Sequence, residues 1–313
     1  MNTKQKIIVI LGQTATGKSD FAVEVAKQIN GEVISADSRQ VYKGMDLGTG
    51  KITKKEMKGI PHYLLDVVSP SRVFTVSNFQ KQANKIIKDI SKNGKVPIIC
   101  GGTGFYIDAI INETIFPNVE PNKKLRERLE KKSAEQLFEI LKKLDKDRAE
   151  NIDQNNKVRL IRAIEIAKAL GKVPKLSARQ GLAENKLKIL KIGLVLPPEV
   201  LKERIHTRLL ARMKKGMIKE IENLHKSGVS WKRLNNLGLE YRYVSQYLQN
   251  LSRQPKSGKI TKQEMLEKLN TEIWHFAKRQ KTWFKRDPNI IWIDPRKKTE
   301  KIKALKEIKR FLK

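Results

Sequence analysis

Short apolar runs, rich in β-branched residues, alternate with amphipathic segments over two parts of this chain. The runs have the length of buried strands, and the amphipathic segments repeat apolar residues three and four positions apart, which is typical of helices packed on a sheet. Strands that alternate with helices predict an α/β fold, a parallel sheet with helices on both faces. The expected strands are 7–11, 32–37, 62–67, 96–100, 189–196 and 290–293.

Between these two parts the pattern becomes purely helical. The change comes near Pro117–Pro121, and residues 123–170 contain no strand signal. Ser133 and Gln136 have the spacing of a capping box, and Asn156 can cap a second helix. We therefore expect one α/β core, residues 1–118 and 189–313, interrupted by an inserted all-helical lobe at 119–188.

The first apolar run leads directly into residues 12–19, GQTATGKS, which match the pattern G-x-x-x-x-G-K-[ST] in full. Gly12 and Gly17 allow the tight backbone in which successive N–H groups point at a phosphate, and the helix that follows adds its positive N-terminus. Lys18 supplies a mobile charge, and the Ser19 hydroxyl can ligate Mg²⁺. This phosphate loop predicts a core of the P-loop type; a glycine-rich turn that binds nothing is the alternative.

Two more polar segments follow strands of the predicted sheet, at Asp37–Gln40 and Gly101–Tyr106. Ligands of open parallel sheets bind at the carboxyl ends of the strands, so we expect both segments to lie beside the phosphate loop. Asp37 could act there as a general base or a Mg²⁺ ligand, or it could only cap the next turn. Thr103 offers a hydroxyl after two glycines that permit close approach of a ligand.

Three arginines, Arg204, Arg208 and Arg212, recur every four residues in a predicted helix and therefore share one face. Such a stripe is usually a solvated face. Beside a phosphate site, however, it could clamp pyrophosphate.

The charge of the chain favours a polyanionic partner. The formal net charge is +33, which fits nucleic acid or an anionic membrane surface; a lysine-biased composition is the alternative. No apolar run approaches 18 residues and no signal-peptide core is present at the N-terminus, so we expect neither a membrane partner nor export. The single cysteine, Cys100, fits a core residue of a cytoplasmic protein, and no zinc-ligand spacing is found.

Six segments resemble the tRNA dimethylallyltransferase (tRNA isopentenyltransferase) family, in order and over nearly the whole chain, from about residue 7 to residue 294. The pair ADSRQVYKGMDLGT and AKRQKTWF is far more specific than a phosphate loop alone. The six segments are GQTATGKS, ISADSRQVYKGMDLGTGK, PHYLLDV, GGTGFYI, VRLIRAIEI and AKRQKTWFKR.

The resemblance implies transfer of a dimethylallyl group from dimethylallyl diphosphate to N6 of the adenosine just 3′ of a tRNA anticodon, position 37 of the tRNA. It implies that Asp37 is the general base on the adenine amine, that Thr103 positions this centre and that Lys18 assists the leaving group. It also implies Mg²⁺ as cofactor and a monomeric protein. The diphosphate would be bound by Gly12, Gln13, Thr14, Ala15, Thr16, Gly17, Lys18, Ser19 and Arg208.

The family's tRNA contacts also map onto this chain, and the helical lobe would grip the anticodon arm. Two segments depart from the family pattern and bear on these contacts more than on prenyl chemistry: 238–243, GLEYRY, replaces Gly-Tyr-[Lys/Arg]-Glu, and 273–276, IWHF, replaces Thr-Arg-Gln. The residues implied to contact tRNA are Asp37, Ser38, Arg39, Gln40, Thr103, Arg126, Val158, Arg159, Leu160, Ile161, Arg162, Lys278, Arg279, Gln280 and Trp283.

Three other functions compete with this interpretation. A P-loop kinase for a small metabolite would explain the phosphate loop and Asp37, but neither the AKRQKTWF segment nor the charge. A free-nucleotide (adenylate) isopentenyltransferase would share most core motifs but needs no basic helical lobe. A non-catalytic RNA-binding protein would explain the charge but leave Lys18 and Asp37 without a role.

Overall fold

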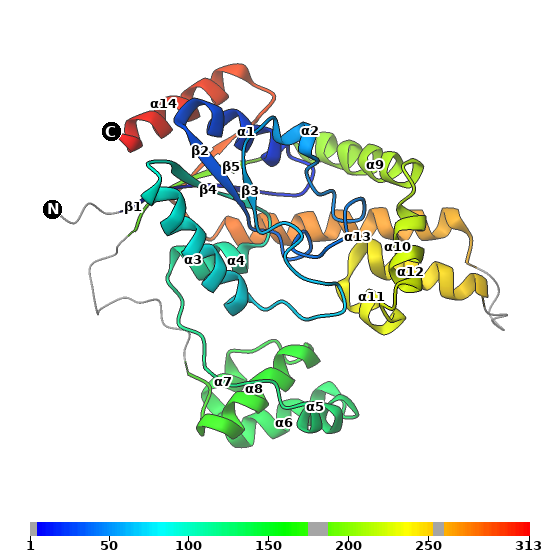
Figure 1. Ribbon diagram of the computed structural model, residues 1–313. Helices are drawn as coiled ribbons and strands as arrows, with labels where there is room; N and C mark the ends of the chain where they lie inside the picture. The colour runs from blue at the N-terminus through cyan, green and yellow to red at the C-terminus, as the bar shows by residue number, and fades with distance from the viewer. Residues whose placement is uncertain (1–4, 175–186, 253–259) are drawn as a thin grey trace. The chain divides into compact units, whose positions relative to one another are not determined.

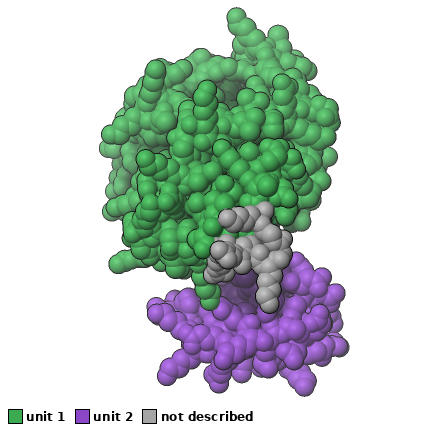
Figure 2. Space-filling view, turned by 90° about the vertical axis from the view of Figure 1, so that its right-hand side faces the viewer, with its two compact units in different colours: residues 1–111, 184–313 green, residues 112–183 purple. Residues whose placement is uncertain are grey.

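The computed structural model describes residues 5–174, 187–252 and 260–313. The chain divides into two compact units, one formed by residues 1–111 with 184–313 and the other by residues 112–183 (Figure 2). The discontinuous unit contains the sheet, and the described residues of the smaller unit form helices and connecting segments. The last part of the predicted insertion, residues 175–186, lies outside the described residues.

The sheet of the larger unit is parallel throughout its described strands, in the order β3-β2-β4-β1-β5-β6. This confirms the predicted α/β fold. Among the described strands, only β6 has the expected extent; β1, β2, β4 and β5 differ by one or two residues at an end, and β3 is four residues shorter. The edge strand β3 covers two residues because Leu64 and Asp66 adopt positive φ, which ends the extended backbone, and β5 begins at Leu187, where it pairs with Gln5. The strands are β1 (Gln5–Gly12), β2 (Gly31–Ser35), β3 (His62–Tyr63), β4 (Val96–Gly101), β5 (Leu187–Leu194) and β6 (Ile290–Ile293).

Both faces of the sheet are buried, as the β1 residues show. Ile7, Val9 and Leu11 face helices α3 and α4, whereas Ile8 and Ile10 face α1 and α14. Figure 1 shows these helix pairs on opposite sides of the sheet. Each such isoleucine is fully buried, a contribution of roughly 1.5–3 kcal/mol to stability. The helices are α1 (Lys18–Ile29), α2 (Lys54–Met57), α3 (Val76–Lys92), α4 (Gly104–Ile111) and α14 (Lys298–Leu312).

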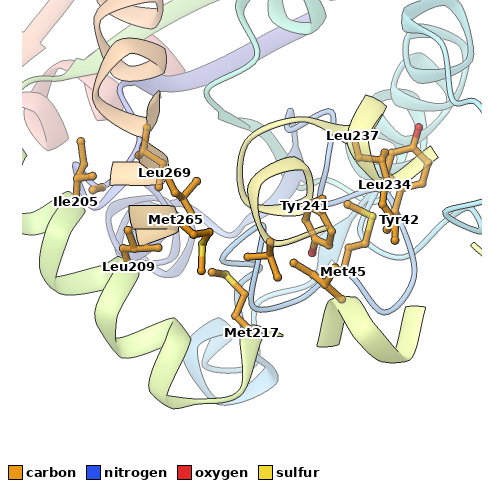
Figure 3. Close-up of a cluster of buried hydrophobic side chains, with 14 of the residues drawn as sticks. Tyr42, Met45, Ile205, Leu209, Met217, Leu234, Leu237, Tyr241, Met265 and Leu269 are labelled. Carbon is orange, nitrogen blue, oxygen red and sulfur yellow. The ribbon is translucent and has the colours of Figure 1, made fainter. Parts of the chain in front are cut away.

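A second hydrophobic cluster of the same unit lies among the helices that follow β5. Leu209, Tyr241 and Leu269 come from three of these helices and pack with Tyr42 and Met45 from the loop after β2 (Figure 3). The loop is thereby held against the helices, at the carboxyl end of β2. The helices are α9 (Pro198–Lys214), α10 (Met217–Lys226), α11 (Trp231–Leu237), α12 (Leu239–Ser252) and α13 (Lys262–Phe284).

The all-helical unit has a small core of its own, centred on Leu137, Leu141 and Leu160. The predicted capping box of Ser133 and Gln136 forms, and the Asn156 side chain caps the last helix. The helices are α5 (Lys123–Glu130), α6 (Ala134–Leu144), α7 (Lys146–Glu150) and α8 (Lys157–Leu170). Over the described part of the chain, none of the helices combines the length and apolar character needed to cross a membrane.

Candidate functional site

The phosphate loop connects β1 to α1 with the backbone that its sequence predicts. Gly12 and Gly17 have φ of 139° and 91°, in the region that side chains disfavour. Thr16 stabilises the turn by donating its hydroxyl hydrogen to the Gln13 carbonyl at 2.8 Å. Ser19 lies in the first turn of α1 and is exposed to the cavity described below. The loop thus presents backbone N–H groups and a helix N-terminus to an anion.

Lys18 lies within this anion site, with its ammonium donating to the Gln13 carbonyl. Burial lowers its pKa from 10.5 to about 8, and the neighbouring charge of Arg208 acts in the same direction, against the opposing effects of Cys100 and Asp37. Cys100 is buried, as expected of a core residue. Burial raises the pKa of its thiol to about 12, so it is no nucleophile at neutral pH.

Asp37 follows β2 and is fixed in a tight turn. Its Oδ1 accepts the backbone N–H groups of Arg39 at 2.8 Å and Gln40 at 3.3 Å. Thr103, which follows β4, accepts the Ser38 N–H on its hydroxyl at 3.0 Å. Sequence reasoning anticipated that these two strand ends would meet, and the Ser38–Thr103 bond is their direct link.

One cavity of about 550 Å³ is lined by half of the predicted site residues of the larger unit, and Thr103 is not among its lining residues. The phosphate loop, Asp37 and Gln40 form part of its wall, and residues of α9 form another part. The arginine stripe therefore faces a phosphate site. The residues predicted to bind diphosphate or to act in catalysis that line the cavity are Thr14, Ala15, Gly17, Lys18, Ser19, Asp37 and Arg208, together with Arg204 and Arg212 of the same stripe.

The loop 46–51 also lines the cavity, and residues that sequence reasoning missed hold it in place. The carboxylate of Glu220 on α10 accepts the N–H groups of Asp46, Leu47 and Gly48 at 2.6–3.0 Å, and the Tyr241 hydroxyl at 2.8 Å. No local sequence pattern predicts this contact, because 172 to 174 positions separate Glu220 from the loop.

Lys51 fixes the other end of this loop. Its side chain is 5% exposed, and its ammonium contacts Asp46 at 2.6 Å and Asp66 at 2.5 Å. Both ends of the cavity-lining loop are therefore charge-paired or hydrogen-bonded to the rest of the unit.

Gln280 on α13, implied by the resemblance to contact tRNA, points into the protein. It is 7% exposed, and its amide bridges the Thr14 N–H and the Gly102 carbonyl. Its neighbours Lys278 and Arg279 are exposed. Trp283 donates its indole N–H to Asp108 at 2.9 Å. The helix thus presents cations outward and an amide inward.

The implied tRNA residues of the all-helical unit also divide between surface and core. Val158 is 78% exposed and Arg159 is exposed, whereas Leu160 and Ile161 are buried. Arg126 and Arg162 are both bound to the buried carboxylate of Glu165, at 2.7 and 2.5 Å. Two of the predicted contact arginines therefore have an internal partner.

The departing segment 238–243 contributes to the interior of the larger unit. Glu240 is 8% and Tyr241 1% exposed. Glu240 pairs with Arg212 at 3.2 Å, and Tyr241 packs against Gly48. In the other departing segment, Phe276 lines the cavity and Lys202 lies over the Trp274 ring at 5.3 Å.

A parallel sheet with a phosphate loop, and a carboxylate in the same cavity, are the features of a P-loop-type protein that binds a phosphorylated ligand. A family model described as IPP transferase matches residues 40–287. The chain belongs to this family of tRNA-modifying transferases.

Named relatives agree. The chain is 44% identical over 287 residues to tRNA dimethylallyltransferase 2 of Treponema denticola, covering 91% of this chain and 93% of the relative. The crystal structure of the tRNA isopentenylpyrophosphate transferase of Bacillus halodurans has a TM-score of 0.73 and 34% identity, covering 99% of this chain and 97% of that one. A eukaryotic dimethylallyltransferase solved acting on tRNA has a TM-score of 0.69 and 25% identity, covering 90% and 70%.

Proposed function

We propose that this chain transfers a dimethylallyl group from dimethylallyl diphosphate to N6 of the adenosine on the 3′ side of the anticodon in tRNA, and releases diphosphate. The observation that supports this most directly is the single cavity whose wall carries both the phosphate loop and Asp37. Relatives named for this activity, at 44% identity over nearly the whole chain, support the choice of reaction.

Asp37 is the proposed general base. The exocyclic amine of adenine is a weak nucleophile because its lone pair is delocalised into the ring. As the new C–N bond forms, the C–O bond to diphosphate breaks and the amine proton passes to the Asp37 carboxylate, a contribution of about 10²- to 10⁴-fold to the rate. The two N–H bonds on Oδ1 hold the carboxylate in place, and the Thr103–Ser38 bond steadies its turn.

The leaving group carries growing negative charge, and the cavity wall also carries cations and N–H donors. Lys18, the backbone of the phosphate loop and Arg208 are the proposed diphosphate ligands. Such preorganised donors stabilise the transition state more than the substrate.

The donor set also fits Mg²⁺, with Ser19 as its protein ligand. The hydroxyl of Ser19 and the carboxylate of Asp37 both line the cavity, and oxygen is the donor that Mg²⁺ prefers. Among the described residues, no cluster of three or more His, Cys, Asp or Glu side chains could hold a metal by itself. A bound Mg²⁺ would neutralise diphosphate charge and take most of its ligands from the substrate and water.

The tRNA contacts are proposed for the exposed members of the implied set. Lys278 and Arg279 on α13, and Val158 and Arg159 on α8, are accessible to RNA. Basic side chains give most of the affinity through phosphate contacts. The reacting adenosine would have to leave its stack to reach Asp37, as in other enzymes that act on bases.

The test is incubation with Mg²⁺, dimethylallyl diphosphate and unmodified tRNA with adenosines beside the anticodon, followed by mass spectrometry of the nucleosides. AMP and ATP serve as parallel acceptors. Prenylated adenosine in tRNA alone is the expected result. Prenylation of AMP or ATP instead would assign the chain to free nucleotides. ATP hydrolysis or phosphoryl transfer without any prenylation would replace the proposal by a kinase.

A further inference from the structure

Two arginines of α9, one turn apart, converge on the cavity loop at Gly50. This glycine has φ of 58°, and a Cβ placed on it would collide with the Arg212 guanidinium and lie 3.2 Å from Nη2 of Arg208. Both guanidinium groups therefore lie against bare backbone. They also line the cavity together with Lys18.

The two arginines differ in their partners. Nη1 of Arg212 is 3.2 Å from Oε1 of Glu240, and the side chains of this pair are 15% and 11% exposed. Arg208 opens onto the cavity and makes no hydrogen bond or ion pair with another of the described residues. Protein atoms around its guanidinium, and then the like charge of Arg212, lower its pKa to about 10, which leaves it protonated at neutral pH.

The cavity wall as a whole carries more basic than acidic side chains. The basic lining residues are Lys18, Lys51, Arg204, Arg208, Arg212 and Lys215, and the acidic ones are Asp20, Asp37, Asp46 and Glu56. Like charges brought together repel one another unless an anion compensates them. Diphosphate is the anion that the proposed function brings to this cavity.

A guanidinium is planar and offers five N–H donors in a fixed fork. Glu240 accepts from one side of the Arg212 fork and so fixes the plane of the group. The other side, Nη2, lies beside Gly50 on the cavity wall, where it remains to donate to an anion.

We propose that Arg212 is a second diphosphate-binding arginine of this enzyme and that Glu240, from α12, is the residue that positions it. The inference rests on the proposed function, because it takes diphosphate as the ligand. The alternative is that the Arg212–Glu240 pair only holds α9 against α12 and binds no anion. A joining pair would alter thermal stability but not the affinity for an anion.

The experiment measures inorganic pyrophosphate binding to the full chain by calorimetry in Mg²⁺, with thermal unfolding and tRNA prenylation followed in parallel. Arg212→Gln should raise the dissociation constant of pyrophosphate about 10- to 100-fold, the effect of losing a charge-assisted hydrogen bond. Arg310→Gln, on the exposed face of α14, is the matched control and should leave it unchanged. Arg212→Lys keeps the positive charge but lacks the planar guanidinium, so it should weaken pyrophosphate binding several-fold.

A double-mutant cycle tests the positioning role. In a Glu240→Gln background the penalty of Arg212→Gln should shrink by at least about threefold, because the fork is no longer held. An unchanged penalty would remove Glu240 from the proposal.

Wild-type affinity in folded Arg212→Gln would overturn the proposal for Arg212. If Arg212→Gln unfolds at a lower temperature than the wild type, the pyrophosphate affinity of Arg212→Lys is used instead, and wild-type affinity in that variant would overturn the proposal. Failure of the wild-type chain to prenylate tRNA, by contrast, would remove the proposed function and leave the pyrophosphate measurements to stand alone.

Discussion

The side-chain amide of Gln280 joins the phosphate loop to the turn after β4: its Oε1 accepts the Thr14 N–H at 2.8 Å and its Nε2 donates to the Gly102 carbonyl at 2.9 Å. Gln13 strengthens the same junction by donating to the Ala277 carbonyl at 3.0 Å. Helix α13 therefore carries exposed cations on one face and holds the phosphate loop with the other.

Replacement of Gln280 by Glu tests this junction. The carboxylate can still accept from Thr14, but it cannot donate to Gly102, and it adds a negative charge next to the diphosphate site. We expect kcat/KM for dimethylallyl diphosphate to fall about 10- to 100-fold. Gln263→Glu, at the exposed start of the same helix, is the control and should retain activity. Equal kcat/KM in the two variants would show that the Gln280 junction does not contribute to activity.

Asp37→Asn should lower kcat for prenyl transfer by about 10²- to 10⁴-fold, because the amide cannot take up the amine proton. The side-chain oxygen of asparagine can keep the two N–H bonds of the turn, so tRNA affinity should stay within about twofold. Single-turnover prenylation and filter binding measure the two quantities. Asp89→Asn, exposed on α3, is the control. Undiminished turnover in Asp37→Asn would exclude this carboxylate as the base.

The lowered pKa of Lys18 predicts a basic limb in the pH profile. As pH rises through about 8, the free enzyme loses the ammonium that binds diphosphate, so kcat/KM for dimethylallyl diphosphate should fall. Bound diphosphate raises the pKa of Lys18, so kcat should decline only at higher pH. Steady-state kinetics between pH 7 and 9 distinguish the two curves. A flat kcat/KM over this range would contradict the assignment.

Glu165 predicts a stability effect confined to the all-helical unit. Burial raises the pKa of this carboxyl, but hydrogen bonds from Arg126 and Arg162 outweigh that effect, so its pKa lies below the ordinary value. Its stabilisation is therefore present above the ordinary pKa and is lost as pH falls through the lowered one.

At neutral pH, Glu165→Gln should destabilise this unit by roughly 2–3 kcal/mol, less than for a fully buried pair because both arginines are about one-third exposed. Hydrogen exchange of residues 112–174 measures the change. Glu139→Gln, exposed on α6, is the control. Equal protection in both variants would contradict the stabilising role of the pair.

The proposed RNA contacts of α13 predict a change in salt dependence. Arg279→Ala should weaken tRNA binding and reduce the slope of log affinity against log salt by about 0.7 to 0.9, the value of one phosphate contact. Lys306→Ala, exposed on α14, should leave the slope nearly unchanged. Titrations between 50 and 200 mM salt give the slopes. An unaltered slope in Arg279→Ala would mean that this face does not meet the phosphate backbone.

Part of the site is visible from local sequence because its signals are local. A phosphate loop needs its glycines, lysine and hydroxyl at fixed spacing. The strand that precedes it is predicted by its run of apolar residues. The carboxyl ends of parallel strands share one edge, so Asp37 and Thr103 could be expected near each other before any coordinates. The buried position of Gln280 was also within reach, because it follows Ile273 and Ala277 at helical spacing on the buried stripe that continues to Phe284.

The sequence by itself thus determined the α/β core, the inserted helices, the phosphate loop and its likeness to a tRNA-modifying family. Only the tertiary structure decided which partners hold these parts together. Glu220 meets a loop more than 170 positions away, and Glu240 meets Arg212 across two helices. Sequence periodicity does not predict such contacts, because each depends on how separate helices pack. Each also depends on the balance between the cost of burying a charge and the gain from pairing it. The phosphate loop can be recognised from the spacing of its residues, whereas the orientation of a charged side chain depends on a partner that is distant in the sequence.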